Sequence, residues 1–131
     1  VIAIKRFDSA DVVASYTYLD KSEDYRIDEV DASFYALNYP PHRATLGLVW
    51  FATDTVEVRI DNEWRKQETN ALRNGGDSAF FSHVTFTYSP AQVEGLSLVL
   101  AVDNLWDERF EEIPGTPGRG DQYSATVTYF W

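Results

Sequence analysis

His42 and His83 are the only histidines in the chain, and imidazole is the side chain that most often acts as a metal ligand or general base near neutral pH. They lie far apart in the sequence, and neither stands at the spacing of a metal-binding pair. The chain contains no cysteine, which excludes disulfides and thiolate metal sites. His83 falls on the polar side of an alternating segment, so we expect it to be structural. The sequence therefore predicts no metal site and no cofactor.

Acidic pairs at Asp107-Glu108 and Glu111-Glu112 raise two other kinds of chemistry. Loop carboxylates can bind Ca²⁺, and paired carboxylates can serve a glycosidase as acid and base. Nothing in the sequence singles out one carboxylate as the acid, and we interpret these residues as a solvated acidic loop. Arg119-Gly120-Asp121 matches an integrin-type tripeptide and is interpreted as part of a turn. The sequence contains no catalytic constellation and predicts that the protein is not an enzyme.

The composition excludes several classes of protein. The 131 residues carry a net charge of −10 at pH 7, whereas a nucleic-acid partner requires a basic face. No stretch approaches the roughly 18 apolar residues of a membrane-spanning helix. The chain starts at Val1, contains no methionine and has no segment with the pattern of a signal peptide. We therefore expect a piece of a longer protein, with any targeting signal upstream.

Alternation with a period of two dominates the chain, as in strands with one apolar and one polar side. The clearest case is 56–65, where valine, isoleucine and tryptophan alternate with glutamate, aspartate and arginine. The pattern recurs at 11–19, 44–50, 83–88, 96–102 and 123–131, and 1–7 is a further candidate. The sequence predicts an all-β protein with six or seven antiparallel strands.

Short and long connections alternate between these segments. Short turns are expected near 8–10, 52–54 and 89–95, and longer loops at 20–42, 66–79 and 106–121. In the longer loops we expect positive φ at Gly75, Gly76, Gly118 and Gly120, and we expect Asn104 to cap a turn. The rhythm is typical of a transmembrane β-barrel with tight turns at one end and larger external loops at the other.

Soluble barrels and sandwiches also alternate strands and turns, but they place their apolar faces inward. Three features favour the membrane barrel. The charges of 57–65 alternate in sign, which suits a polar lumen, and the chain ends in an aromatic residue that continues an apolar pattern. Aromatic residues also recur near strand ends, as in the girdles of membrane barrels: Trp50, Trp64, Tyr88, Trp106, Tyr123 and Trp131. Trp106 is interpreted, together with Phe110, either as an interface anchor or as packed within the last loop.

The final residues, Tyr123-Ser-Ala-Thr-Val-Thr-Tyr-Phe-Trp131, resemble the C-terminal signature that the barrel-assembly machinery recognises in bacterial outer-membrane proteins. Trp131 stands where that signature usually has phenylalanine. Upstream, Val102-Asp-Asn-Leu-Trp-Asp107 followed by Phe110 resembles the Asn-Leu-Phe-Asp-x-x-Tyr element of TonB-dependent receptors. Pro117-Gly118-Arg119 resembles the end of their final external loop, and Pro41-His-Arg-Ala-Thr-Leu46 resembles a segment that opens an earlier strand. The elements follow the order of the family.

The resemblance implies a transporter in the bacterial outer membrane for a scarce nutrient, such as a ferric siderophore, cobalamin or a glycan. Such receptors close a barrel of about 22 strands around a folded plug and are powered through TonB. The chain at 1–131 would be the C-terminal part of such a barrel, with the plug absent. The implied partners are outer-membrane lipid, the barrel-assembly machinery, TonB through the upstream part, and a small-molecule or metal-chelate substrate.

Two sets of residues follow from this topology. Ligand contacts are expected from the external loops and upper lumen wall, at Tyr25, Tyr35, Arg65 and Arg73. The assembly signal is expected at Tyr123, Val127, Tyr129 and Trp131. Two alternatives stay open: a soluble β-barrel or sandwich that binds a small apolar ligand, and a non-transporting outer-membrane barrel.

Overall fold

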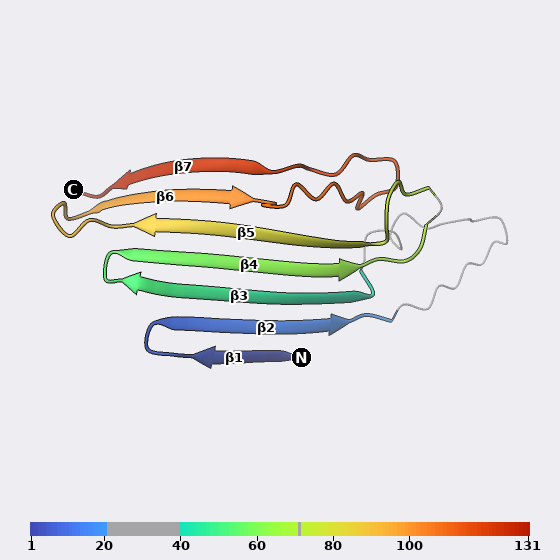
Figure 1. The fold of residues 1–131 in the computed structure, drawn as a ribbon, viewed down its shortest axis with the longest axis horizontal. Coiled ribbons are helices and arrows are strands. Elements are labelled where there is room, and N and C mark those ends of the chain that lie inside the picture. The colour runs from blue at the N-terminus through green and yellow to red at the C-terminus, as the bar shows by residue number, and fades with distance from the viewer. Residues whose placement is uncertain (21–39, 71) are drawn as a thin grey trace.

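The computed structural model describes residues 1–20, 40–70 and 72–131, and these form one antiparallel sheet (Figure 1). The strand order follows the chain from β1 to β7 without a crossover. The strands are β1 (Ile2–Arg6), β2 (Ala10–Tyr18), β3 (His42–Thr53), β4 (Val56–Lys66), β5 (Ser78–Tyr88), β6 (Leu96–Asp103) and β7 (Gln122–Tyr129). In these ranges no helix is long and apolar enough to cross a membrane. The prediction of an all-β antiparallel sheet is confirmed, with seven strands.

Several strand boundaries differ from those that alternation predicted: β3 is longer at both ends than the 44–50 segment, and the differences at β5 and β7 bear on the argument. β5 begins at Ser78, well before the 83–88 segment. Its first half was hidden because Phe80 and Phe81 are adjacent and place a ring on each side of the strand, which interrupts the binary pattern. β7 ends at Tyr129, so Trp131 lies beyond the strand.

The register gives the sheet two chemically different faces, because directly paired residues point to the same side. Val58 lies between Trp50 of β3 and Phe86 of β5, within what we call the apolar face. Asp61 lies between Gly47 and His83, within what we call the polar face. The facing predicted for β4 is therefore confirmed. β1 is the exception: its register pairs Ile2 with Ser15 and Ile4 with Val13, on the polar face, and places Lys5 on the apolar face.

The sheet is a single layer with almost no core. Among the described residues only Ala79 and Phe110 are buried hydrophobic residues. Large apolar side chains on the apolar face are instead exposed, including Leu46, Trp50, Phe86, Leu100 and Val127. A soluble domain of this size would bury such side chains, since their transfer from water is the main favourable term in folding. The apolar face therefore needs a nonaqueous neighbour.

Two cavities lie against the polar face of the sheet. One has a volume of about 530 Å³ and includes Arg65, Phe81 and His83 in its lining. The other has a volume of about 510 Å³ and is lined mainly by polar-face residues, among them Arg43 and Asp61. A barrel closed with this polar face inside and the apolar face outside has the arrangement of a membrane barrel, which is the reverse of a lipocalin-like one.

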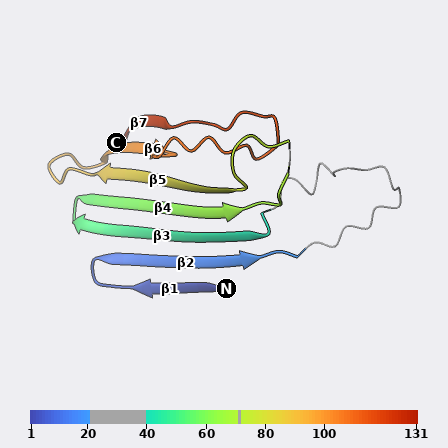
Figure 2. The same cartoon turned by 45° about the vertical axis from the view of Figure 1, so that its right-hand side comes forward.

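The connections separate by length to opposite ends of the sheet (Figures 1 and 2). Tight turns join β1 to β2, β3 to β4 and β5 to β6 at one end. The longer β4–β5 and β6–β7 connections lie at the other end, as the sequence predicted. The part of the predicted 20–42 loop that covers 21–39 lies outside the described residues. We call the end with the β4–β5 and β6–β7 connections the loop end.

Candidate functional site

The β6–β7 loop, 104–121, leaves the sheet abruptly after Asp103. Asn104 and Asp107 both have left-handed backbone conformations, with φ of 52° and 51°. Asparagine and aspartate tolerate this region better than most residues, because their short polar side chains bond locally. The loop stays attached to β5 through the Leu105 amide, which donates to the Ser82 carbonyl at 2.9 Å. The first half of β5 is therefore bordered by this loop instead of by a longer β6.

Asn104 ties the beginning of the loop to its end. Its side-chain amide is buried and donates to the carbonyl oxygens of Glu108 and Arg119, both at 2.9 Å. Its Oδ1 accepts from the Glu108 amide at 2.9 Å, so the predicted turn cap is confirmed. An aspartate could reproduce the accepting bond but not the two donated ones. The amide therefore fixes the path of the whole loop.

Gly118 lies where two loop segments are in van der Waals contact. A Cβ atom there would stand 2.5 Å from the Phe110 carbonyl oxygen and 2.6 Å from the Arg109 carbonyl carbon. The predicted positive φ is confirmed for Gly75 and wrong for Gly76, Gly118 and Gly120; the described glycines with positive φ are Gly75, Gly95 and Gly115. What the Pro-Gly-Arg element requires is close backbone approach, not a left-handed turn.

Arg73 joins the β4–β5 loop to the β6–β7 loop. Its side chain is only 1% exposed, and its Nε donates to the Glu111 carbonyl at 3.0 Å. Its terminal nitrogens donate to the Glu68 carbonyl at 3.0 Å and to the side chains of Gln67 and Asp77, each at 2.6 Å. The guanidinium also lies 5.2 Å from the centre of the Phe110 ring. Each nitrogen of the Arg73 guanidinium therefore donates to an acceptor within the protein, so this side chain joins the two loops and does not face a ligand.

Glu111 provides the second link between the two loops. Its carboxylate accepts from the Gly115 amide at 2.8 Å, and from the amide and side chain of Asn74 at 3.1 and 3.0 Å. The Gly115 bond first, and then those from Asn74, hold the pKa of Glu111 below its usual range, because they stabilise the ionised carboxylate. The interpretation of 107–112 as a solvated acidic loop is therefore wrong for Glu111, which is buried.

Arg65 stands at the end of a row of alternating charges on the polar face. Arg43 pairs with Glu63 at 2.6 Å, Glu63 pairs with Arg65 at 2.6 Å, and Arg65 also binds Glu112 of the β6–β7 loop. The Arg65 guanidinium lies 5.0 Å from the centre of the Phe81 ring. Its two carboxylates differ in exposure: the Glu63 side chain is 14% exposed and that of Glu112 is 62% exposed. Glu112 is therefore the partner that can be exchanged.

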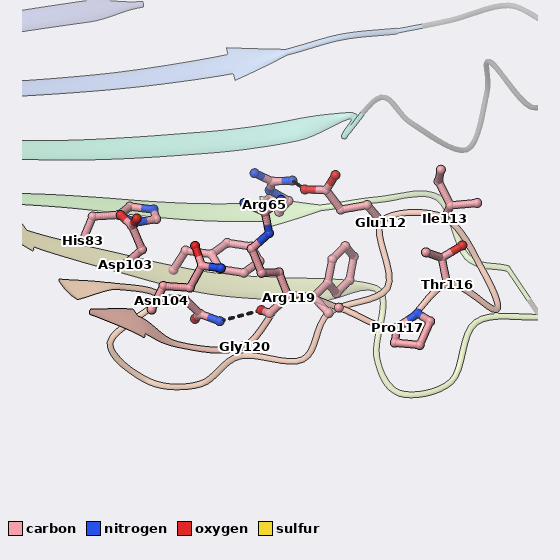
Figure 3. A pocket seen from close by; sticks show the side chains of 14 residues that line it. Arg65, His83, Asp103, Asn104, Glu112, Ile113, Thr116, Pro117, Arg119 and Gly120 are labelled. Carbon is pink, nitrogen blue, oxygen red and sulfur yellow. Dashed lines mark hydrogen bonds and ion pairs between the residues drawn. The ribbon is translucent and has the colours of Figure 1, made fainter. Parts of the chain in front are cut away.

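The 530 Å³ cavity lies between the polar face and the folded-back β6–β7 loop (Figure 3). Its lining brings together two guanidinium groups, from Arg65 and Arg119, and the rings of Phe81 and Phe110. In the part of the chain that the structure describes, the side chain of Arg119 forms no salt bridge. Guanidinium and aromatic surfaces together suit a ligand with both anionic and aromatic groups.

Catalysis has no comparable support at this site. His83 lies 3.1 Å from Asp103, and both side chains are open to solvent. Residues 1–20, 40–70 and 72–131 contain no group of three or more histidine, aspartate or glutamate side chains placed to hold a metal ion.

The structure separates the predicted ligand residues. Arg65 lines the cavity, whereas Arg73 is buried behind it between the two loops. Tyr25 and Tyr35 lie outside the described residues. The sequence did not predict Arg119 as a ligand residue, although Arg119 lies in the Pro117-Gly118-Arg119 element that resembles the receptor family. This element could have indicated the site, but Arg119 was interpreted as part of a turn.

Trp106 and Phe110, which the sequence left open, have different environments. Phe110 is 5% exposed and packs within the loop. Trp106 is 63% exposed, and its Nε1 donates to the Ser82 hydroxyl at 2.7 Å, on the apolar face. Tyr123, Val127 and Tyr129 point to that same face of β7 and are exposed.

The fold was compared with those of known proteins. No protein-family model and no curated protein sequence matches the chain. A ferric enterobactin receptor mutant of Pseudomonas aeruginosa in complex with enterobactin matches with a TM-score of 0.71, at 16% identity, over 98% of this chain and 21% of the receptor. The receptor in complex with BCV-L6 matches with a TM-score of 0.69, at 18% identity, over the same shares. The chain has the fold of part of a ferric enterobactin receptor.

The resemblance to TonB-dependent receptors inferred from the sequence is thus confirmed at the level of the fold. The chain spans about a fifth of the length of the receptors that it matches. These neighbours are named as receptors and not as enzymes.

Proposed function

We propose that the chain forms part of the wall of an outer-membrane receptor that takes up a ferric siderophore, powered through TonB. The observation that carries this proposal is the cavity at the loop end of the polar face, where Arg65 and Arg119 lie beside Phe81 and Phe110. Catecholate and hydroxamate iron chelates offer anionic oxygens, and catecholates also offer rings. Cobalamin and neutral glycans make less use of two guanidinium groups. The outer membrane, the barrel-assembly machinery and TonB are the partners that this function requires.

The geometry supports a binding step based on exchange of anions. An anionic oxygen that reaches the cavity can bind Arg119 directly. It can also replace the exposed carboxylate of Glu112 on Arg65, while Glu63 keeps that guanidinium oriented along the sheet. Charge-assisted bonds of this kind are about twice as strong as neutral ones. Phe81 would support the Arg65 guanidinium that binds the anion, since the two groups lie 5.0 Å apart, centre to centre.

Replacing Arg119 by glutamine should lower the affinity for an anionic ferric siderophore about tenfold, because one charge-assisted contact is lost. Glu112→Gln should raise the affinity, since a competing carboxylate is removed from Arg65. Arg109→Gln is the matched control, because Arg109 is a loop arginine bound to Asp107 outside the cavity lining. Affinity is measured by titration of the purified full-length receptor, and uptake with radiolabelled iron in cells with and without TonB.

Uptake of the chelate that is independent of TonB, or binding of cobalamin or a glycan in its place, would contradict the proposed substrate and coupling. Binding without any uptake would favour the non-transporting barrel. Tight binding of an apolar ligand in plain buffer would support the soluble barrel, which the polar, hollowed face argues against.

The proposed membrane location predicts a clear asymmetry between the two faces. Val58→Arg should destabilise the folded receptor by about 2–4 kcal/mol, because it places a charge at mid-depth on a lipid-facing strand. Glu57→Arg, one residue away on the polar face, should cost much less. Urea titration in lipid vesicles measures both. Equal losses for the two variants would show that the apolar face does not contact lipid.

A further inference from the structure

The strands sort their charges strictly by face. Every carboxylate in the seven strands lies on the polar face: Asp11, Glu57, Asp61, Glu63 and Asp103. The apolar face has none, and its charged or imidazole side chains are Lys5, His42 and Lys66. A chain with a net charge of −10 therefore presents an outer strand surface without carboxylates.

His42 and Lys66 lie side by side at one end of that surface. They are direct partners in the register, at the first residue of β3 and the last residue of β4 (Figure 1). Both therefore stand at the loop end, whereas Lys5 is near the tight turn at the opposite end. Lys66 is exposed, and a lysine there can extend its charge past an apolar surface while its stem covers that surface.

Aromatic side chains contact His42, the first member of this pair. The Tyr16 hydroxyl lies 2.7 Å from His42 Nδ1, and the Tyr18 ring lies 5.1 Å from the imidazole, centre to centre. When Nδ1 accepts from Tyr16, the ring proton is on Nε2, which can donate to an anionic oxygen. Trp64, two residues before Lys66 on the same face, is partly exposed. This is the composition of an interfacial girdle with donors added to it.

We propose that His42, Lys66 and Tyr18 form a site on the apolar face for the phosphate group of an anionic lipid in the outer leaflet. The inference rests on the proposed location in the outer membrane. Charge complementarity selects the occupant: the donors lie at the loop end, at headgroup depth, and the face below them lacks carboxylates and suits acyl chains. A free phosphate ion would use the donors alone, whereas a lipid uses both parts of the surface.

The full-length receptor, inserted in phosphatidylcholine vesicles with or without lipid A, tests the proposal. Lipid that remains bound after extraction is counted by native mass spectrometry. Lys66→Gln should lower the apparent affinity for lipid A about fivefold, and His42→Gln with Lys66→Gln about tenfold or more. Lys66→Arg should retain binding. Lys5→Gln, a lysine on the same face at the other end, is the matched control and should have no effect.

Two results would overturn the site. One is equal lipid A retention by the double variant, the Lys5→Gln control and the unmodified receptor. The other is full displacement of the lipid by inorganic phosphate, which would show an anion site that does not recognise lipid. Protease protection of the same vesicles reports insertion separately. An inserted receptor with unchanged retention refutes only the phosphate site, whereas failure to insert refutes the proposed membrane location and the site with it.

Discussion

Replacing Arg73 by alanine should lower the free energy of unfolding of the loop end by about 3 kcal/mol, the lower part of the range for breaking a buried ion pair. The lower part applies because the partner Asp77 is 27% exposed and recovers some hydration. Gln67, which is 3% exposed, would lose its bond to the guanidinium. The carbonyl oxygens of Glu68 and Glu111 would lose theirs as well. Unsatisfied buried acceptors are what makes this substitution costly.

Hydrogen exchange measures this effect locally, in the receptor inserted in vesicles. The amides of Asn74 and Gly115, which donate to Glu111, should exchange faster in Arg73→Ala while those of β3 and β4 keep their protection. Arg73→Lys should recover only part of the protection, because an ammonium group cannot reproduce the planar set of donors. Arg109→Ala is the control: its side chain is 66% exposed, and the change should stay within about 0.5 kcal/mol. Equal effects of both alanine variants would show that the two loops are not held as one unit.

The sequence predicted the facing of most strands well, because a strand with one apolar and one polar face has a strict period of two. Val58 and Val127 both lie on the apolar face, as alternation required. The pattern failed at Phe80 and Phe81, where the polar face accepts a ring because that ring packs against Arg65. Such a contact between strands changes the binary pattern without changing the fold.

The candidate site was less predictable, because the difference between its arginines is tertiary. Arg65 is the last residue of the alternating segment 56–65 and Arg73 lies in the loop that follows it, and nothing in the sequence indicated different roles for them. Only the return of the β6–β7 loop makes Arg73 a buried link and leaves Arg65 at the cavity. The same holds for Gly118. A side chain there would clash with the backbone of Phe110, and this contact arises from the fold of the whole loop and not from a local turn that the sequence could indicate.

Glu111 and Glu112 show how adjacent identical residues take different roles. Glu111 is bound by amides and has a lowered pKa, whereas the exposed Glu112 pairs with Arg65. A carboxylate with a lowered folded-state pKa stabilises the loop above the ordinary glutamate pKa, and this contribution is lost as the pH falls through the lowered value. The loop end should therefore loosen only on acidification, a property that composition alone could not assign to either residue.

Trp131→Ala should reduce the receptor inserted in the outer membrane of living cells to a small fraction, while costing less than about 1 kcal/mol of stability. The structure explains the small second effect: β7 ends at Tyr129, and the Trp131 side chain is fully exposed, with Tyr129 as an aromatic neighbour at 6.3 Å between ring centres. The ladder between β6 and β7 does not involve this residue. We therefore expect Trp131 to act in recognition by the assembly machinery. In the sequence it completes the alternating pattern of Tyr123, Val127 and Tyr129 that resembles the barrel-assembly signal.

Two comparisons separate recognition from packing. Trp131→Phe should insert nearly normally, since the signature usually ends in phenylalanine, and Phe130→Ala should have a smaller effect, because this exposed aromatic neighbour stands outside the alternating pattern. In vesicles without any assembly factor, Trp131→Ala should refold with nearly the yield of the unmodified receptor. A loss of yield there equal to the loss in cells would assign the residue to folding of the barrel itself. Normal insertion of Trp131→Ala in cells would show that Trp131 is not part of an assembly signal. The exposed side chain beyond the hydrogen-bond ladder would then not be recognised by an assembly factor.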